Sequence, residues 1–129
     1  MKALAGFLAV FEEPGFQFGT WHGGERKEPG VISMPYFVLS ETAESFVRMA
    51  YEQGWVLMGF DWPAWKETEE AIALRDDPNA LAAASPEQLA KLLTVLIRQD
   101  RFVEGRLNSA FEAGLLTGIA RRANILANG

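Results

Sequence analysis

The sequence predicts a mainly α-helical fold, a single irregular helical domain of about six helices with a short two-stranded β-ribbon near residues 16–38. Apolar side chains recur at helical spacing over most of the chain, and capping residues and glycines divide it into segments. β-Branched and aromatic residues gather on either side of a glycine-rich stretch within residues 16–38. With 129 residues, 49% of them hydrophobic, the chain can bury one core, so we expect one domain over residues 1–129.

The N-terminal part predicts one helix followed by the ribbon. Residues 3–13 place large apolar side chains on one helical face, and Pro14 with the glycine after it ends this pattern. Residues 16–21 and 31–38 are expected to pair as the two strands, with the polar segment between them as the hairpin tip. Pro35 marks an edge or the end of the second strand, because it lacks a backbone N–H.

The central part predicts two helices. Ser40 is placed to cap the first, which has an apolar stripe and ends at Gly54. The apolar run over residues 55–60 fits a helix or a strand equally well. Asp61 is placed to cap the second helix, which is expected to continue to Arg75 because acidic residues precede this basic one in the order that the helix dipole favours.

A capping box opens the longest predicted helix. The Ser85 hydroxyl can accept from the backbone N–H of Gln88, and the Gln88 side chain can reach back to the backbone of Ser85. Leucines at helical spacing follow, and the helix is expected to run to Glu104. Glycines then separate a short helix over residues 106–113 from a final helix over residues 115–126.

Asp100 is the most unusual residue of the long helix. On an ideal helix it lies about 20° from Leu89, so it points along the apolar stripe between Leu96 and Val103. A buried carboxylate must be paired or hydrogen-bonded, so we expect Asp100 to be mostly buried and to fix the helix register. Its partner is expected among Arg121, Arg122, a tryptophan indole N–H and the free N–H groups of a later helix. The alternative is a carboxylate that lines a pocket.

Four polar residues are candidates for the pocket of a small-molecule-binding or hydrolytic domain: Asp61, Asp100, Arg101 and Glu104. On a continuous helix, Glu104 lies one turn from both Asp100 and Arg101. Two carboxylates at this spacing can share a metal ion or act as an acid–base pair. A divalent ion needs more ligands than the sequence places here, so no metal site is predicted.

Two tryptophans directly after Asp61 form the second candidate site. Trp62 and Trp65 are three residues apart, and their large area fits a core or an exposed aromatic platform that anchors a partner. Together with Trp55 they are candidate anchors of a protein interface. The complete set of candidate binding residues is Asp61, Trp62, Trp65, Arg98, Asp100, Arg101 and Glu104.

The charge distribution disfavours nucleic-acid binding. The net charge is −5, whereas sequence-independent binding to phosphates needs surplus lysine and arginine. Residues 1–84 carry 13 acidic and 6 basic side chains, a charge of −7, and residues 85–129 carry 4 and 6, a charge of +2. The acidic part is either ordinary surface variation or a face for a basic partner. A nucleic-acid binder is a distant alternative that rests on five arginines: Arg98, Arg101, Arg106, Arg121 and Arg122.

The composition also excludes several kinds of functional site and indicates a cellular compartment. There is no cysteine, which excludes disulfides and thiolate zinc sites and fits a cytoplasmic protein. No apolar run reaches the roughly 20 residues that a membrane span needs. The single histidine, His22, lies in a predicted loop without a nucleophile motif, and no phosphate-binding loop is present. We therefore expect no cofactor and, on balance, no enzymatic activity.

The C-terminal third of the chain contains a motif of four short segments: Leu92-Leu93-Thr94, Ile97-Arg98, Asp100-Arg101-Phe102 and Glu104-Gly105. It resembles a signature of a family of uncharacterised bacterial proteins, a domain of unknown function. Upstream, the segments around Pro35 and Trp62 are similar to that family too. The resemblance implies a helical bacterial protein in which Asp100, Arg101 and Glu104 form one unit, and it brings no activity with it.

Two functions remain after these exclusions. The first is a non-enzymatic protein-interaction module, a small acidic adaptor, inhibitor or self-associating protein, because four Trp and nine Phe are many for one small core. The second is the small-molecule-binding or hydrolytic domain built on the four-residue pocket. Convergence of those four residues in a concave site favours the second function, and local ion pairs beside an aromatic surface favour the first.

Overall fold

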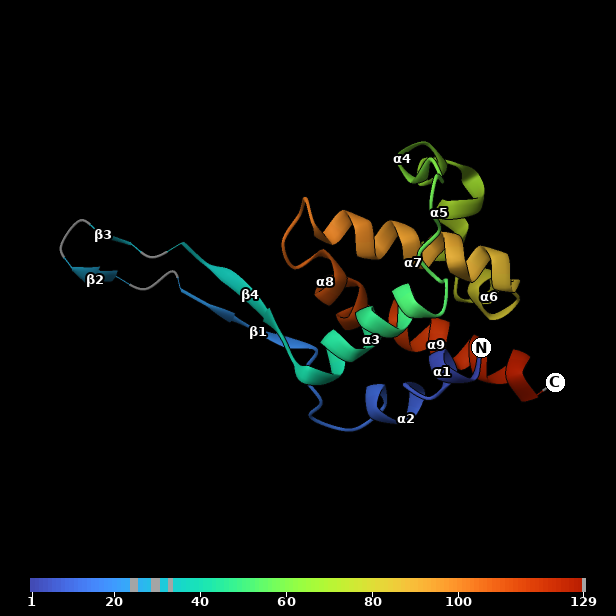
Figure 1. The fold of residues 1–129 in the computed structure, drawn as a ribbon, viewed down its shortest axis with the longest axis horizontal. Coiled ribbons are helices and arrows are strands. Elements are labelled where there is room, and N and C mark those ends of the chain that lie inside the picture. The colour runs from blue at the N-terminus through green and yellow to red at the C-terminus, as the bar shows by residue number, and fades with distance from the viewer. Residues whose placement is uncertain (24–25, 29–30, 33, 129) are drawn as a thin grey trace.

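An extended antiparallel ribbon projects from one end of a body made of helices (Figure 1). The structure, a computed structural model, describes residues 1–23, 26–28, 31–32 and 34–128. Within these residues, helices dominate and the β structure is confined to the ribbon, so the predicted mainly α fold with a short β-ribbon is confirmed. No helix in the described ranges is long and apolar enough to cross a membrane.

The elements follow one another with short connections. The helices are α1 (Lys2–Ala5), α2 (Leu8–Phe11), α3 (Glu41–Glu52), α4 (Trp62–Trp65), α5 (Glu69–Asp76), α6 (Pro78–Ala82), α7 (Pro86–Asp100), α8 (Arg106–Glu112) and α9 (Leu115–Asn128). The strands are β1 (Gly19–His22), β2 (Arg26–Glu28), β3 (Val31–Ile32) and β4 (Tyr36–Leu39).

The prediction of one continuous helix over residues 3–13 is wrong. The chain forms two one-turn helices, and between them the Phe7 N–H bonds the carbonyl of Leu4, three residues back, in a tighter turn than an α-helix has. The apolar face survives the break, since Leu4 and Phe11 are both buried. Both short helices pack against α9, which brings the two ends of the chain together (Figure 1).

The ribbon forms as the sequence predicts. β1 pairs with β4 in antiparallel register, with Thr20 opposite Val38 and Trp21 opposite Phe37, and Pro35 directly precedes β4. The short strands β2 and β3 continue the pairing farther from the body. The predicted tip is wrong in its described part, because His22 belongs to β1 and Arg26–Glu28 form β2, while residues 24–25 and 29–30 lie outside the described residues.

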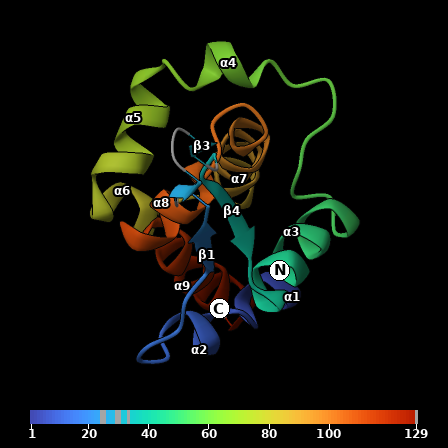
Figure 2. The same cartoon turned by 90° about the vertical axis from the view of Figure 1, so that its left-hand side faces the viewer.

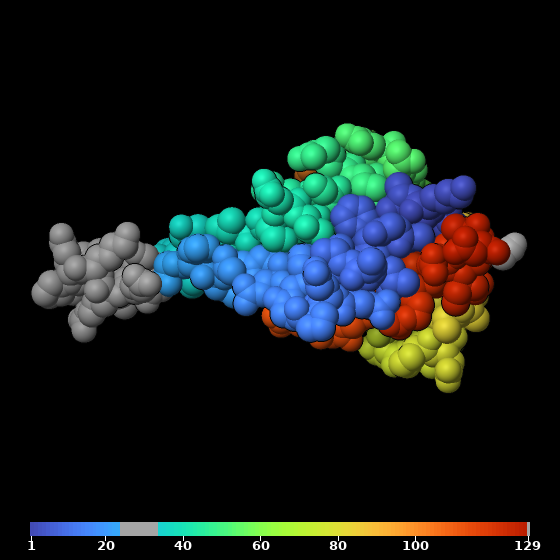
Figure 3. All heavy atoms as spheres, turned by 90° about the horizontal axis from the view of Figure 1, so that it is seen from below, coloured from blue at the N-terminus to red at the C-terminus, as the bar shows by residue number. Residues whose placement is uncertain are grey.

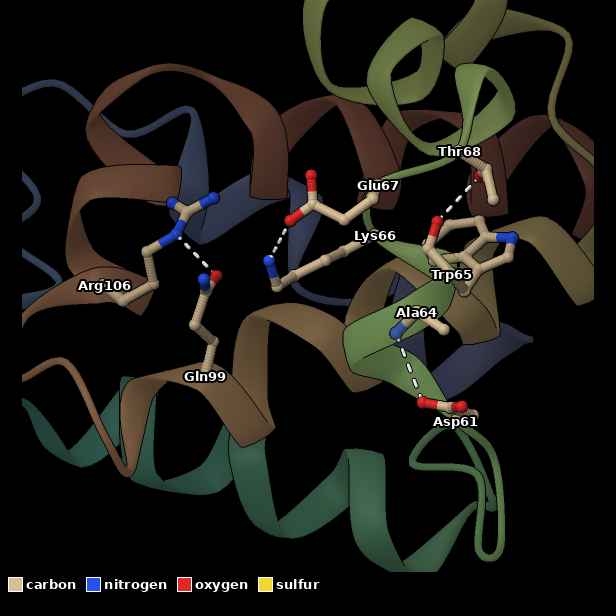
Figure 4. Close-up of polar contacts among 8 residues, drawn as sticks. All are labelled: Asp61, Ala64, Trp65, Lys66, Glu67, Thr68, Gln99 and Arg106. Carbon is tan, nitrogen blue, oxygen red and sulfur yellow. Dashed lines mark hydrogen bonds and ion pairs between the residues drawn. The ribbon is translucent and has the colours of Figure 1, made fainter.

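The helix predicted from Asp61 to Arg75 is divided in two. α4 ends at Trp65, and Thr68 begins α5 by accepting the N–H of Ala71 at 3.2 Å. The Thr68 hydroxyl also donates to the Trp65 carbonyl at 2.7 Å, so one side chain satisfies groups of both helices (Figure 4). The ambiguous run over residues 55–60 is neither helix nor strand.

The capping box is confirmed. The Gln88 N–H donates to Ser85 Oγ at 3.1 Å, and the Ser85 N–H donates to Gln88 Oε1 at 2.9 Å. The predicted end of α7 at Glu104 is wrong, because the helix stops at Asp100. Tight turns follow, in which the Phe102 N–H bonds the Gln99 carbonyl, three residues back, and Gly105 at φ +85° starts α8.

The core surrounds α7. Viewed along the ribbon, α7 lies between α3 on one side and α5 with α6 on the other (Figure 2). α7 contributes eight buried residues, among them Leu89, Leu93 and Leu96. A second group of rings joins the N-terminal helices, the start of the ribbon, α3 and α8. We call it the aromatic cluster, and its members are Phe7, Phe11, Phe16, Phe18, Phe46 and Phe111.

Candidate functional site

The ribbon is attached to the helical body at the loop that links α7 to α8, residues 101–105. The backbone N–H of Phe37 on β4 donates to the carboxylate of Glu104 in this loop. The Trp21 ring on β1 lies against Gly105, so closely that a Cβ added to this glycine would come within 2.6 Å of Trp21 Cζ2. Because Gly105 also has φ +85°, glycine alone suits both the backbone and the ring that packs on it.

The hydrogen-bond pattern shows which backbone groups of the ribbon point outward. The Ser40 N–H donates to the Phe18 carbonyl at 2.9 Å, so this pair is bonded across the ribbon. Bonded and non-bonded pairs alternate in an antiparallel ladder. The pair Trp21–Phe37 is therefore a non-bonded pair, and the N–H and C=O groups of both residues point away from the ribbon, as the contact between Phe37 and Glu104 also requires.

The two long edges of the ribbon consequently differ. On the β4 edge, Pro35 has no N–H and the Phe37 N–H is bonded to Glu104, which leaves the N–H of Leu39, at the base of the ribbon, as the outward donor. On the β1 edge, the outward groups belong to Gly19 and Trp21, and no other described residue bonds to them. The β1 edge is therefore open for another strand, and the β4 edge is largely closed.

Exposed apolar side chains lie on both faces of the ribbon, and Trp21 is the one on β1. Trp21 is 53% exposed, and it packs edge-on against Phe37 at a centroid distance of 5.2 Å. On the opposite face of the ribbon, the Tyr36 ring stacks on His22 at 5.6 Å. We call the exposed apolar side chains on the ribbon and on the loop at its base the arm surface, and they are Trp21, Met34, Tyr36, Val38, Phe102 and Val103. Figure 3 shows the coloured part of the ribbon, which includes β1 and β4, extending from the helical body.

A family model described as a family of unknown function (DUF6508) matches residues 1–129. The chain belongs to DUF6508. Comparison with curated proteins gives no match, and comparison with solved structures gives none either. The expected membership of a family of unknown function is confirmed. Because the description of DUF6508 names no activity, the function of this member has to be argued from its geometry.

Asp100 of this DUF6508 chain is held by one of the partners that the sequence predicts, the N–H group of a later helix. Its Oδ1 accepts the N–H of Leu107, in the first turn of α8, at 3.0 Å. Asp100 is paired, as predicted, and it is half-buried rather than enclosed on all sides, because α7 ends there and Val103 is exposed. The two predicted arginine partners bond elsewhere, Arg122 to the Ala84 carbonyl and Arg121 to Glu12.

We expect the Asp100→Ala variant to lose about 1–2 kcal/mol of unfolding free energy, because α8 loses the acceptor for one N–H of its first turn. The Asp100→Asn variant keeps a side-chain oxygen and should lose less. Urea unfolding of both variants measures this difference. A loss of about 3 kcal/mol or more in the alanine variant, the range for a disrupted buried ion pair, would contradict the half-buried geometry.

None of the four residues of the predicted pocket lines the cavity that the structure shows among α5, α6, α8 and α9. Asp61 caps α4 by accepting the N–H of Ala64 at 3.2 Å (Figure 4). Glu104 bonds to β4 as described above, and Arg101 lies over the Tyr51 ring at 6.0 Å from its centroid. Each of the four side chains thus has a contact within the chain, but none of them forms, among the described residues, the ion pair that was expected of an interaction module. In the described part of the chain, no group of three or more metal-ligating side chains is present.

The remaining candidates divide between core and surface. Trp55 and Trp65 are buried, whereas Trp62 is half-buried and stacks on Phe102 at 6.4 Å. The Arg98 Nε is buried without a hydrogen-bond partner among the described residues. Trp21, the most exposed of the four Trp, is not among the sequence candidates. Its place in the strand predicted over residues 16–21, on the face opposite to Phe16 and Phe18, is the signal that could have identified it.

Proposed function

We propose that this member of DUF6508 is a non-enzymatic protein-interaction module that self-associates through the β1 edge of its ribbon. The observation that carries the proposal is the difference between the two edges: Glu104 and Pro35 close the β4 edge, while Gly19 and Trp21 leave the β1 edge open. An exposed edge beside exposed aromatic rings is a template for strand addition.

The low stability expected of a two-stranded ribbon is a second argument that another strand pairs with it. An isolated two-stranded hairpin is marginally stable in water, and three or more strands with an apolar face are needed for independent stability. The base of the ribbon is secured by Glu104 and Gly105, but the strands extend beyond these contacts (Figure 1). A strand added at the β1 edge would supply the missing backbone bonds and cover part of the arm surface.

A second copy of the chain fits this edge by symmetry. Two β1 strands can pair in antiparallel fashion about a two-fold axis perpendicular to the ribbon, which gives the strand order β4-β1-β1-β4. This axis keeps the Trp21 rings of both copies on one face of the sheet, where they add apolar contact. The net charge of −5 on each copy opposes association at low salt, so added salt should strengthen the dimer.

The proposal predicts a concentration-dependent dimer that a single proline removes. In the Trp21→Pro variant, the outward N–H of the open edge is missing and its place is taken by a ring, so β1 can no longer pair with a second β1. We expect dimerisation at least about tenfold weaker than in the Trp21→Ala variant, since each copy loses a hydrogen bond. Sedimentation velocity over a concentration series measures the association of both variants and of the parent chain.

The alanine variant is the matched control, because both substitutions remove the indole and its contact with Gly105 and only proline removes the donor. Circular dichroism and thermal melting establish that both variants remain folded. A parent chain that stays monomeric at every accessible concentration would falsify the proposal. Equal dimerisation of the proline and alanine variants would place the contact elsewhere than the β1 edge.

A further inference from the structure

A cavity of about 500 Å³ lies among α5, α6, α8 and α9, away from the ribbon. Its wall is apolar where Leu74, Leu81, Leu115 and Ile125 line it. Four arginines and one carboxylate also line it, which makes it strongly positive in a protein of net charge −5: Arg75, Arg106, Arg121, Arg122 and Asp76. A cavity of this size with apolar walls and a few converging charged groups is typical of small-molecule sites.

Two of the arginines are held in place by neutral acceptors. The Arg106 Nε, in the first residue of α8, donates to Gln99 Oε1 at 2.9 Å (Figure 4). The Arg122 Nε, on α9, donates to the carbonyl of Ala84 at 2.7 Å. A carbonyl or amide oxygen orients a guanidinium without cancelling its charge. Each arginine therefore keeps its terminal nitrogens and its positive charge for another partner.

Arg75 and Arg106 both line the cavity, and they have no shared counter-ion among the described residues. Burial, and secondly the charge of Arg75, lower the pKa of the Arg106 guanidinium. In the described part of the chain, no carboxylate lies within ion-pair distance of either arginine. Two like charges in a partly buried site are unfavourable, and an anion between them would remove this repulsion.

The nearby carboxylates do not neutralise the site. Glu67 is bonded to Lys66, whose hydrogen bond and charge lower the pKa of Glu67, with Arg75 only a minor contributor (Figure 4). Arg121 pairs with Glu12 at 3.6 Å, while both side chains remain largely exposed. Asp76 is the one carboxylate that lines the cavity within the described ranges, against four arginines.

We propose that this cavity binds a small organic phosphate, with the phosphate oxygens between Arg75 and Arg106 and the organic part on the apolar wall. The planar guanidinium fork matches phosphate oxygens in pairs, and a dianion suits an excess of positive charge better than a single carboxylate does. Inorganic phosphate alone would leave most of the 500 Å³ and the wall formed by Leu74, Leu81 and Leu115 unused. The site shares no lining residue with the β1 edge, so it does not depend on the proposed self-association.

The test uses phenyl phosphate as the probe, in isothermal titration calorimetry at about pH 8, where the phosphate is a dianion. Phenyl phosphate should bind more tightly than inorganic phosphate, which lacks the ring, and than benzoate, which is a monoanion. Phenol, which lacks the charge, should show no binding. The Arg75→Gln and Arg106→Gln variants should each bind phenyl phosphate about tenfold more weakly than the parent chain, because each removes charged hydrogen bonds to the ligand.

Arg48→Gln is the matched control, because it changes the net charge equally on α3, outside the cavity. It should bind phenyl phosphate as the parent chain does. Because Arg106 also bonds to Gln99, melting curves must show that the Arg106→Gln variant is folded. If that variant is unfolded, the Arg106→Lys variant replaces it, because lysine keeps the positive charge and loses the guanidinium fork.

Three results would overturn the proposal. The first is unchanged binding in the Arg75→Gln variant, and the second is benzoate binding as tight as that of phenyl phosphate. The third is tighter binding of a single-stranded oligonucleotide than of phenyl phosphate, with the same loss of affinity in the two arginine variants. That result would assign the cavity to a nucleic-acid backbone.

Discussion

The Phe46→Ala variant is expected to lose about 4 kcal/mol of unfolding free energy, the range for a large ring removed from a packed core. Phe46 is fully buried on α3 in the middle of the aromatic cluster. Its ring packs edge-on against Phe7 at 5.2 Å and against Phe11 at 5.4 Å, and Phe18 lies at 6.4 Å. These rings come from segments that are too short to be stable by themselves, so the loss of Phe46 weakens all their contacts together.

Thermal melting tests this expectation, and a loss of that size should lower the melting temperature by more than about 10 °C. Phe102→Ala is the control, because it removes the same ring from a position that is 77% exposed. The control should unfold within about 0.5 kcal/mol of the parent chain. If both variants melted alike, the aromatic cluster would not be the core contact that its geometry indicates.

The second large effect is expected at Thr94, a fully buried polar residue in the middle of α7. Its Oγ1 accepts the N–H of Leu57 at 2.9 Å, and the hydroxyl lies within 2.7 Å of the Ala90 carbonyl and 3.2 Å of the Trp55 carbonyl. The hydroxyl has one proton for the two carbonyls, whereas the Leu57 N–H depends on the oxygen alone. Thr94 thus holds the irregular segment after α3 against the long helix.

Replacement by valine keeps the shape of this side chain and removes the hydroxyl. We expect the Thr94→Val variant to lose about 2–3 kcal/mol, because a buried N–H and a buried carbonyl lose their partner. The Thr94→Ser variant keeps the hydroxyl and loses one methyl group, at a cost of about 1 kcal/mol. Urea unfolding should rank the serine variant above the valine variant, and the reverse order would mean that the hydroxyl does not stabilise the segment.

The predictions that succeeded rest on local chemistry. Ser40 and Ser85 cap their helices because a serine side chain at a helix start finds its N–H partner three residues away, whatever the rest of the chain does. The ribbon was predictable for a similar reason, since β-branched and aromatic residues flank a glycine-rich turn. Gly54 has φ +79°, as the expected end of α3 requires.

The predictions that failed depend on contacts between distant segments. The apolar pattern continues past Asp100 to Val103, so periodicity extended α7, but the Leu107 N–H draws Asp100 toward α8 and the chain turns. The run over residues 55–60 is irregular, and its Leu57 N–H is bonded by Thr94, which lies far along the chain, so local periodicity could not predict its structure. The cavity was also out of reach, because it forms only when α5, α8 and α9 bring their arginines together.

The loop between α7 and α8 gives the two proposed sites a mechanical connection. Glu104 and Gly105 secure the ribbon, and the next residue, Arg106, lines the cavity. A ligand that pulls on Arg106 therefore acts on the segment that sets the position of β1 and β4. If the cavity binds a phosphate and the ribbon pairs with a second copy, any factor by which the phosphate changes the affinity of the dimer is also the factor by which the dimer changes the affinity for phosphate.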